Sequence, residues 1–188
     1  MAPPNALSCA LFLVLAFSFA GLIQARWLGS RWSRRFDWPL DAGLRFRNRR
    51  LFGDNKTARG FIAMVPASAL GFALVAAVMT TPSWPLSLAQ YLALGAAAGF
   101  GFMAGELPNS FIKRQFDIAP GQAPSNPVGH VLSALIDRLD SVVGMALVLG
   151  WLVPVPVSTW LIVIVVGPVL HGLFSVLVFR WGGKARAA

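Results

Sequence analysis

The feature that most restricts the fold of this chain is a stretch of 39 residues, from 141 to 179, without any Lys, Arg, Asp or Glu. One helix of that length would be about 58 Å long, whereas the hydrocarbon layer of a membrane is about 30 Å thick. Pro154 and Pro156 lie inside the stretch, and proline interrupts helices. We therefore expect two membrane-spanning helices, near residues 135–153 and 158–179, joined by a tight turn.

Three other stretches lack these charged residues and are long enough to cross a membrane: residues 6–25, 61–80 and 86–104. Of all residues 56% are apolar and 12% are charged, against roughly 45–50% and about 25% in an average soluble domain. This composition excludes a water-soluble globule and a disordered chain. We predict an all-α polytopic membrane protein with about five transmembrane helices, in which residues 1–188 form a single integral membrane domain.

Basic residues fall on one side of the membrane in such a five-helix chain. Of the 16 Lys and Arg residues, ten lie between positions 26 and 59, three between 113 and 138, and three in the C-terminal tail. Because basic loops stay on the cytoplasmic side, we expect cytoplasmic loops at 26–60 and 105–134 and an N-terminus outside. Trp84 and Trp151 lie near predicted span ends, where tryptophan is common.

Residues 6–25 could also be read as a cleaved signal peptide. Such a peptide carries basic residues before its apolar stretch. Here none precedes it, whereas Arg26 follows it directly. We interpret the stretch as the first transmembrane helix.

The third apolar stretch has glycines at a spacing that allows close helix packing. Gly95 and Gly99 form one small-xxx-small frame, and Gly101 and Gly105 form a second. Such frames let the backbone of a neighbouring helix approach. We expect these positions to serve packing rather than ligand binding.

The end of the first predicted loop, residues 53–60, reads Gly-Asp-Asn-Lys-Thr-Ala-Arg-Gly. A glycine-flanked segment of this kind can offer backbone N–H groups and an ammonium group to phosphate oxygens. It lacks the spacing of a P-loop. The alternative is that Lys56 and Arg59 only meet anionic lipid, at about 1 kcal/mol each.

The second predicted loop brings acidic and basic residues to the ends of two spans. Glu106 follows the third span, and Asp137 and Asp140 begin the fourth. Two residues three apart share one helix face, and carboxylate oxygens are natural Mg²⁺ ligands. An ordinary interfacial charge cluster around Arg138 is the alternative. With the basic residues of both loops on the same side, the pattern suits a nucleoside triphosphate at a membrane surface.

At these residues the sequence resembles a known family. Ser-Phe-Ile-Lys-Arg at 110–114, followed after a spacer by Asp-Arg-Leu-Asp at 137–140, is similar to the signature of the CTP-dependent phosphatidate cytidylyltransferases. The chain resembles more closely the smaller CDP-archaeol synthase family, which shares its size, its five predicted spans and the element at 53–60. Together the matched motifs cover about a quarter of the chain.

The resemblance implies an enzyme that transfers a cytidylyl group from CTP to the phosphate of an ether-linked isoprenoid lipid and releases pyrophosphate. It implies a Mg²⁺ cofactor, with Asp137, Asp140 and Glu106 as its ligands. The catalytic residues implied are Lys113, Arg114, Asp137 and Asp140. The substrate-binding residues implied are Asn55, Lys56, Arg59, Ser110 and Arg138.

Two positions depart from the family pattern. Family members usually have Asp where this chain has Glu106, which puts the metal role of that residue in question. Arg138 is more typical of the phosphatidate enzymes, so a phosphatidate cytidylyltransferase that makes CDP-diacylglycerol is the first alternative. A small transporter is the second, because Pro66 and Pro168 could break helices within spans.

The expected partners follow from the same resemblance. They are CTP, a phosphorylated membrane lipid and the bilayer, with no nucleic acid. The active site is expected on the cytoplasmic side of the cell membrane. The sequence leaves the oligomeric state open, a homodimer included.

Overall fold

The computed structural model describes residues 3–80, 83–120, 122 and 127–181. Its elements, in chain order, are α1 (Ala6–Gly29), the 3-10 helix η1 (Trp32–Phe36), β1 (Arg45–Phe46), β2 (Arg49–Arg50), α2 (Ala58–Val78), α3 (Leu88–Gln115), α4 (Pro127–Leu152) and α5 (Val157–Arg180). Two of the three basic residues of the C-terminal tail, Lys184 and Arg186, lie outside the described residues. Helices dominate the described chain, and an all-α fold is confirmed.

Four of the described helices, α1, α2, α3 and α5, are long and apolar enough to cross a membrane. The fifth, α4, has 26 residues and carries Asp137, Arg138 and Asp140 near its middle, and no charged residue follows Asp140 in the helix. The prediction of a polytopic helical membrane protein is confirmed. The charges of α4 mark where the helix bundle becomes polar.

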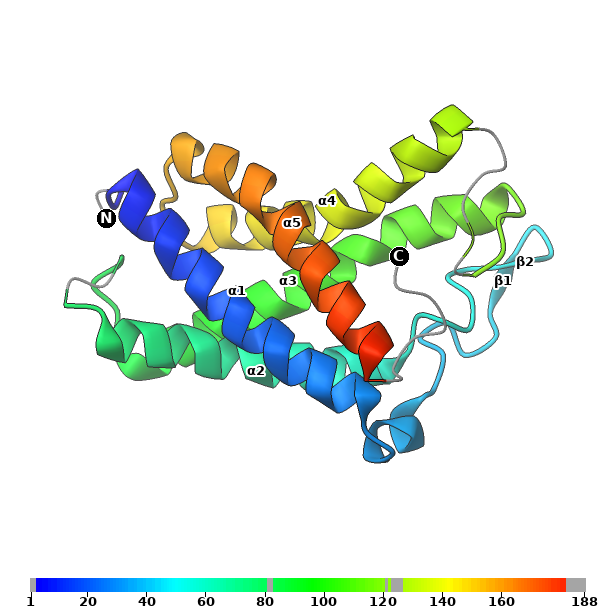
Figure 1. Ribbon diagram of the computed structural model, residues 1–188, viewed down its shortest axis with the longest axis horizontal. Coiled ribbons are helices and arrows are strands. Elements are labelled where there is room, and N and C mark those ends of the chain that lie inside the picture. The colour runs from blue at the N-terminus through cyan, green and yellow to red at the C-terminus, as the bar shows by residue number, and fades with distance from the viewer. Residues whose placement is uncertain (1–2, 81–82, 121, 123–126, 182–188) are drawn as a thin grey trace.

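Helix α3 has two neighbouring helices, and the remaining helices pack against these. This helix lies against α2 on one side and α4 on the other, and α1 packs against both α2 and α5. Figure 1 shows the C-terminal end of α3 beside the β1–β2 hairpin, whereas the N-terminal end of α4 rises away from it. The hairpin is antiparallel, and its turn residues Arg47 and Asn48 have positive φ angles of 50° and 63°.

Glycine contacts bring α3 close to both of its neighbours, as the sequence predicts. A Cβ atom added at Gly95 would lie 2.5 Å from the backbone oxygen of Ser68 in α2. One added at Gly144 in α4 would lie 2.2 Å from the backbone oxygen of Gly101. These approaches are possible only without side chains, so the glycines fix where the helices cross.

The expected loop at 105–134 is largely helical, which corrects the sequence-based boundary. Helix α3 runs on to Gln115, and α4 begins at Pro127. The expectation counted only uncharged residues, whereas a helix continues beyond the apolar layer wherever its polar side chains find partners. Glu106 and Lys113 therefore lie on helix α3 rather than in a loop.

Prolines behave differently at the two kinds of position. Pro154 and Pro156 separate α4 from α5, as predicted. Pro66 and Pro168 lie inside α2 and α5, and both helices continue through them. The broken helices that a transporter reading requires are therefore not found at these two prolines.

Of the two tryptophans expected at span ends, Trp151 is exposed and Trp84 is buried. The side chain of Trp151 is 90% exposed, as an anchor at the membrane surface would be. Trp84 is 1% exposed, and its indole N–H donates to the backbone oxygen of Pro154 at 3.0 Å. Its ring packs edge-on against Phe12 in the main apolar core.

Candidate active site

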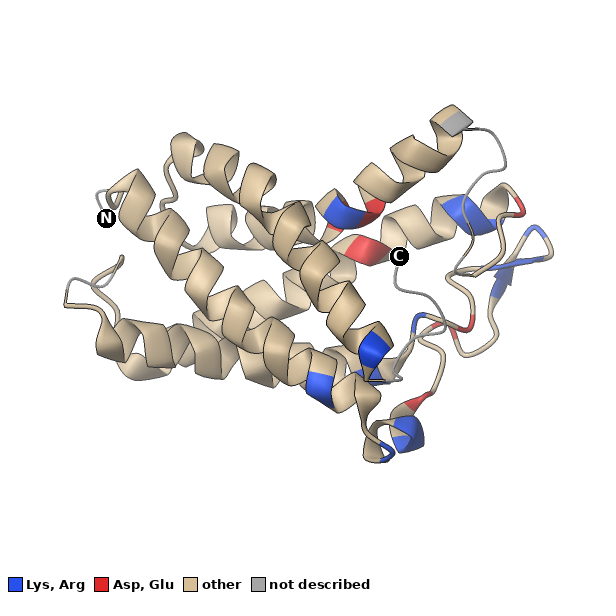
Figure 2. Ribbon diagram, in the orientation of Figure 1, with Lys and Arg blue, Asp and Glu red and all other residues tan. Residues whose placement is uncertain are grey.

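Charged residues gather at one end of the helix bundle. Figure 2 shows long parts of α1, α2 and α5 without a charged residue, whereas Lys, Arg, Asp and Glu collect on α3, on α4, in the loop with the β1–β2 hairpin and at the C-terminal ends of α1 and α5. The two blocks that the sequence analysis singled out, one before α2 and one shared by α3 and α4, meet at this end. The polar cluster described below is built from them.

Helix spacing puts the polar residues of each helix on one face. Glu106, Asn109 and Lys113 follow one another along α3 at intervals of three and four residues. Asp137 and Asp140 do so along α4, with Ser141 next in the chain. Such intervals bring side chains to neighbouring positions on a helix surface. The two polar faces are turned toward each other.

Hydrogen bonds join α3 and α4 at one end of the polar cluster. The ammonium group of Lys113 donates to Asp137 Oδ2 at 2.6 Å. The side-chain amide of Asn109 donates to Asp137 Oδ1 at 2.6 Å and to Asp140 Oδ2 at 3.1 Å. Asn109 thus bridges the two aspartates.

The same series of contacts continues to the α1–α2 loop, residues 30–57. The hydroxyl of Ser141 donates to Glu106 Oε1 at 2.9 Å and lies 3.4 Å from Asp140 Oδ1. The other oxygen of Glu106 accepts a hydrogen bond from the ammonium group of Lys56. The polar cluster therefore consists of seven side chains: Lys56, Glu106, Asn109, Lys113, Asp137, Asp140 and Ser141.

The glycine crossing of α3 and α4 positions the acidic residues of the cluster. A Cβ atom at Gly105 would lie 2.4 Å from the backbone oxygen of Asp140. Gly105 directly precedes Glu106 in α3. A close backbone approach of the two helices is therefore adjacent to their polar faces, and Ser141 lies within hydrogen-bond distance of the carboxylates of both Glu106 and Asp140.

A buried aspartate shapes the α1–α2 loop that delivers Lys56. Asp41 is 2% exposed and accepts hydrogen bonds from the backbone N–H groups of Gly43, Phe52 and Gly53, at 3.0 to 3.1 Å. The guanidinium group of Arg50 also donates to it. Burial by itself would raise the pKa of Asp41, but these donors outweigh it and hold the pKa well below its usual range.

Lys56 remains protonated in its partly buried position. Its side chain is 20% exposed, and that of Glu106 is 17% exposed. Burial by itself would lower the pKa of Lys56, but the negative charges of Glu106, Asp140 and Asp137 outweigh it, and the pKa is raised. The two lysines of the cluster thus pair with Glu106 and Asp137; the first pair is largely shielded from solvent, whereas the side chain of Asp137 is 46% exposed.

Among the residues that the structure describes, Arg114 differs from the other basic residues of the site because it is buried and two of its donor atoms have no hydrogen-bond partner. Arg114 is 8% exposed. Within the described chain its Nε and Nη1 atoms have no hydrogen-bond partner. Nη1 lies 3.3 Å from the position of a Cβ added at Gly53, whose φ angle is +90°. A desolvated guanidinium group beside a glycine turn is suited to an anion.

Four expected substrate-binding residues lie around the polar cluster, and no hydrogen bond found in the described chain joins them to it. Asn55 is exposed in the α1–α2 loop, and Ser110 is buried in α3. Arg59 pairs with Asp37 at 3.4 Å. Arg138 donates to the backbone oxygen of Ala134 at 3.0 Å, close to Gly172 of α5.

Two members of the cluster, Asn109 and Ser141, were missed by the sequence analysis. Asn109 lies three residues after Glu106, and Ser141 directly follows Asp140. A search for any polar side chain on the same helix face as the acids would have found both.

The metal-binding capacity of the site rests on two carboxylates. Across the part of the chain that the structure describes, no three Asp, Glu, His or Cys side chains form a group that could hold a metal ion. Glu106 is instead paired with Lys56. Asp137 and Asp140 nevertheless both direct an oxygen at the amide nitrogen of Asn109. One or two carboxylates suffice for Mg²⁺ when substrate phosphates and waters complete its shell, so the donor set fits.

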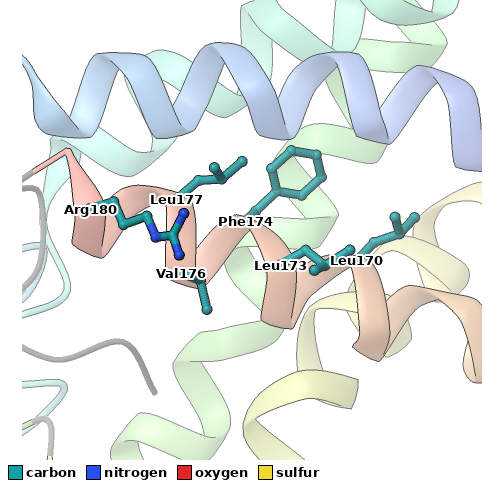
Figure 3. Close-up of a pocket in the computed structure, with 6 residues that line it drawn as sticks. All are labelled: Leu170, Leu173, Phe174, Val176, Leu177 and Arg180. Carbon is teal, nitrogen blue, oxygen red and sulfur yellow. The ribbon is translucent and has the colours of Figure 1, made fainter.

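A hollow of about 440 Å³ lies along α5 and is separate from the polar cluster in its lining. Figure 3 shows its side chains, which are apolar except for Arg180 at the C-terminal end of the helix. None of them belongs to the polar cluster. The chemistry of this chain is therefore assigned to the polar cluster, where acids and bases converge, and not to the hollow.

Comparison with known proteins gives a consistent result. A family model described as CarS-like, CDP-archaeol synthase, matches residues 35–186. The CDP-archaeol synthase of Methanoculleus marisnigri is 30% identical over 78% of this chain and 87% of its own length. That of Thermofilum pendens is 28% identical over 88% of this chain and 70% of its own length.

One solved structure supports the fold independently. It is described as an intramembrane enzyme for archaeal membrane lipids biosynthesis, and it superposes with a TM-score of 0.65. The match covers 89% of this chain and 92% of the other, at 22% sequence identity. At that identity the similarity concerns the arrangement of the helices.

Proposed function

The chain belongs to the CDP-archaeol synthase family, and we infer from this that it is a membrane-embedded, CTP-dependent cytidylyltransferase acting on the phosphate of an ether-linked isoprenoid lipid. The products are pyrophosphate and a CDP-activated lipid for phospholipid synthesis. The observation that carries this inference is the unbroken series of polar contacts from Lys113 to Lys56. It joins the two sequence blocks of the family into one site.

The basic residues of the site are assigned to the triphosphate of CTP. Lys113 and Lys56 stand at the two ends of the polar cluster, and Arg114 lies beside the Gly53 turn with unpartnered donors. Transfer of a phosphoryl-type group requires mainly positioning and neutralisation of charge. These three cations supply the charge, and the exposed Asn55 can reach the nucleotide from the same loop.

Asp137 and Asp140 are proposed to hold Mg²⁺, because their oxygens converge on one point between α3 and α4. Bound there with substrate phosphates, the ion would offset charge on the leaving pyrophosphate. Glu106 is assigned a different part from the one first expected. It holds Lys56 in place through the buried ion pair and connects it to Ser141.

The lipid phosphate needs no strong base to act as a nucleophile, since it is already anionic near pH 7. One of its oxygens attacks the α-phosphorus of CTP, the bond from that phosphorus to the bridging oxygen breaks, and pyrophosphate leaves with the electron pair. Arg138, close to α5, and Arg59, at the start of α2, are proposed to meet the lipid phosphate. Ser110 is proposed to support the helix face beneath.

The orientation in the membrane is part of the same proposal. We place the polar cluster on the cytoplasmic side and the N-terminus outside, because the α1–α2 loop holds most of the basic residues. Single cysteines introduced at Arg47 or Trp151, in a Cys9→Ser background, test this in sealed vesicles. A membrane-impermeant thiol reagent is expected to label the two positions from opposite sides.

The function is tested by mixing the purified protein with CTP, Mg²⁺ and a phosphorylated lipid. Pyrophosphate release and transfer of labelled CMP to lipid are expected only when all three are present. Asp140→Asn is expected to abolish transfer. Transfer at the wild-type level by Asp140→Asn would remove this residue from the site.

The same assay decides between the two lipid classes. An ether-linked isoprenoid glycerophosphate and a diacyl phosphatidate carry the same phosphate and differ in their chains. We expect kcat/KM to be higher for the isoprenoid lipid, as the family relationship indicates. A clear preference for phosphatidate would assign the chain to the CDP-diacylglycerol reaction instead.

A further inference from the structure

Asn109 occupies the point on which both site aspartates converge. Its amide nitrogen lies 2.6 Å from Asp137 Oδ1 and 3.1 Å from Asp140 Oδ2. The residue is held on α3, one turn from Glu106 and one turn from Lys113. No motif used in the sequence analysis includes it.

The electrostatics of this point favour a positive group. Two carboxylate oxygens lie within 3.1 Å of one atom, and like charges this close repel unless a donor or a cation stands between them. In the protein alone the N–H groups of Asn109 take that position. The ammonium group of Lys113 compensates the charge of Asp137. It donates to Asp137 Oδ2, the oxygen that Asn109 does not contact.

We propose that Asn109 is a further ligand of the divalent cation held by Asp137 and Asp140. The amide nitrogen and oxygen of asparagine are nearly equal in size, and a half turn of the carboxamide exchanges them. With the nitrogen toward the aspartates, Asn109 keeps them at a fixed spacing in the absence of metal. With the oxygen toward them, it offers a neutral oxygen ligand beside the two carboxylates.

This inference rests on the proposed function, because it takes the cation from that proposal. The combination of ligands is chemically reasonable, since kinase active sites also hold Mg²⁺ with an aspartate and an asparagine. A residue that only spaces the aspartates would need its N–H groups and never its oxygen. The two roles therefore predict opposite effects for a carboxylate at position 109.

The test measures binding of Mn²⁺, as a probe for Mg²⁺, to the full-length protein in detergent. Free Mn²⁺ is followed by electron paramagnetic resonance, with and without CTP. Asn109→Ala is expected to weaken Mn²⁺ binding by about tenfold or more, as loss of a ligand or its support does. Asn109→Asp is expected to bind Mn²⁺ as tightly as the wild type or more tightly.

A matched control separates local ligation from net charge. Asn48→Asp adds the same charge in the exposed β1–β2 turn, where Asn48 has a φ angle of 63° that aspartate tolerates. It is expected to leave Mn²⁺ affinity within twofold of the wild type. Circular dichroism shows which variants fold. If Asn109→Ala does not fold, the Mn²⁺ affinity of Asn109→Asp alone decides whether Asn109 is a ligand.

Two results with the variants would overturn the proposal. One is an Asn109→Ala protein that binds Mn²⁺ within twofold of the wild type. The other is an Asn109→Asp protein weakened as much as Asn109→Ala, which shows that only the N–H groups matter. A wild-type protein that binds no Mn²⁺ with or without CTP overturns it as well.

The enzymatic assay keeps this proposal distinct from the proposed function. A wild type that transfers CMP to lipid while Asn109→Ala keeps full Mn²⁺ affinity disproves the ligand and leaves the function intact. A wild type that binds Mn²⁺ through Asn109 but transfers no CMP disproves the function and leaves the ligand intact.

Discussion

The ammonium group of Lys56 is bonded to the carboxylate of Glu106, a residue 50 positions further along the chain. Among the residues that the structure describes, no other side chain of the α1–α2 loop bonds to the polar cluster residues of α3 and α4, although Arg49 donates to the backbone oxygen of Gln115 at the end of α3. Through Ser141 the ion pair reaches α4 as well, at 2.9 Å from Glu106 Oε1. The position of a basic loop residue is therefore set by a carboxylate on a membrane helix.

Glu106→Gln is expected to lower both stability and CTP use. The substitution leaves the ammonium group of Lys56 largely buried without the counter-charge to which it is bonded, so the free energy of unfolding should fall by about 1–3 kcal/mol. Because Lys56 loses its fixed position, kcat/KM for CTP should fall at least about tenfold, or about 1.4 kcal/mol in transition-state stabilisation. Unfolding in detergent and steady-state kinetics with CTP measure the two effects.

A double-mutant cycle provides the control for this pair. Lys56→Met and Glu106→Gln, alone and together, should show a coupling in unfolding free energy of about 1 kcal/mol or more. Additive effects of the two substitutions would show that the ion pair contributes nothing to stability.

The glycine crossing of α3 and α4 gives a second prediction. In Gly144→Ala the new Cβ would lie 2.2 Å from the backbone oxygen of Gly101 and 2.6 Å from Gly105 Cα, so the helices must move apart. Overpacking of this kind costs about 1–3 kcal/mol. The loss of transition-state stabilisation, from kcat/KM, should be larger than the loss of unfolding free energy, because the same shift separates Asp140 from the polar face of α3.

Gly150→Ala is the matched control on the same helix. A Cβ added at Gly150 would meet nothing within 4 Å. Alanine is favoured over glycine inside a helix by up to about 1 kcal/mol, so this variant should be as stable as the wild type or more so. Equal melting temperatures and activities for the two variants would contradict the crossing as the positioning device.

Much of this fold follows from the distribution of charge along the sequence. Long uncharged stretches give the helices, the two prolines give the α4–α5 turn, and the glycine frames of α3 give its close contacts with α2 and α4. These features are local or periodic, so a sequence displays them directly. The approach of Lys113 to Asp137 follows from the same reasoning about one polar side.

The rest depends on partners that local patterns do not specify. Helix α3 extends beyond its apolar stretch to Gln115, along residues whose polar side chains bond to α4. Glu106 pairs with a lysine rather than joining two aspartates because Lys56 arrives from a distant loop. The fixing of that loop by Asp41, through three backbone N–H groups, leaves no repeat or spacing in the sequence.

Asp41 gives a pH-dependent prediction. The pKa of Asp41 is lower in the folded protein than the value of about 3.9 in an unfolded chain. Its contribution to stability is therefore complete above about pH 5 and is lost as the pH falls below about 4 toward the folded-state pKa. Asp41→Asn should lower the free energy of unfolding by about 1–3 kcal/mol at pH 7.

The comparison of two pH values tests this assignment. The difference in melting temperature between the wild type and Asp41→Asn should be large at pH 7 and smaller at pH 3. Asp54→Asn is the control, because Asp54 is 77% exposed and pairs with the same Arg50; its effect should stay below about 1 kcal/mol. An undiminished difference at pH 3 would show that the charge of Asp41 is not what stabilises the loop.

Arg114 should show opposite effects on stability and on nucleotide binding. Arg114 is 8% exposed, and in the described chain its Nε and Nη1 atoms have no hydrogen-bond partner. Replacing a buried charge that lacks a partner by an apolar side chain of similar length removes a desolvation cost. Arg114→Met should therefore melt at the same temperature as the wild type or higher.

The same substitution should raise the KM for CTP about tenfold or more, since the proposed anion contact beside Gly53 is lost. Arg47→Met, in the β1–β2 turn, serves as the control for loss of one positive charge and should change neither quantity. Thermal unfolding in detergent and CTP titrations at saturating lipid measure the two effects. A lower melting temperature with an unchanged KM would mean that Arg114 stabilises the fold and does not bind a phosphate of CTP.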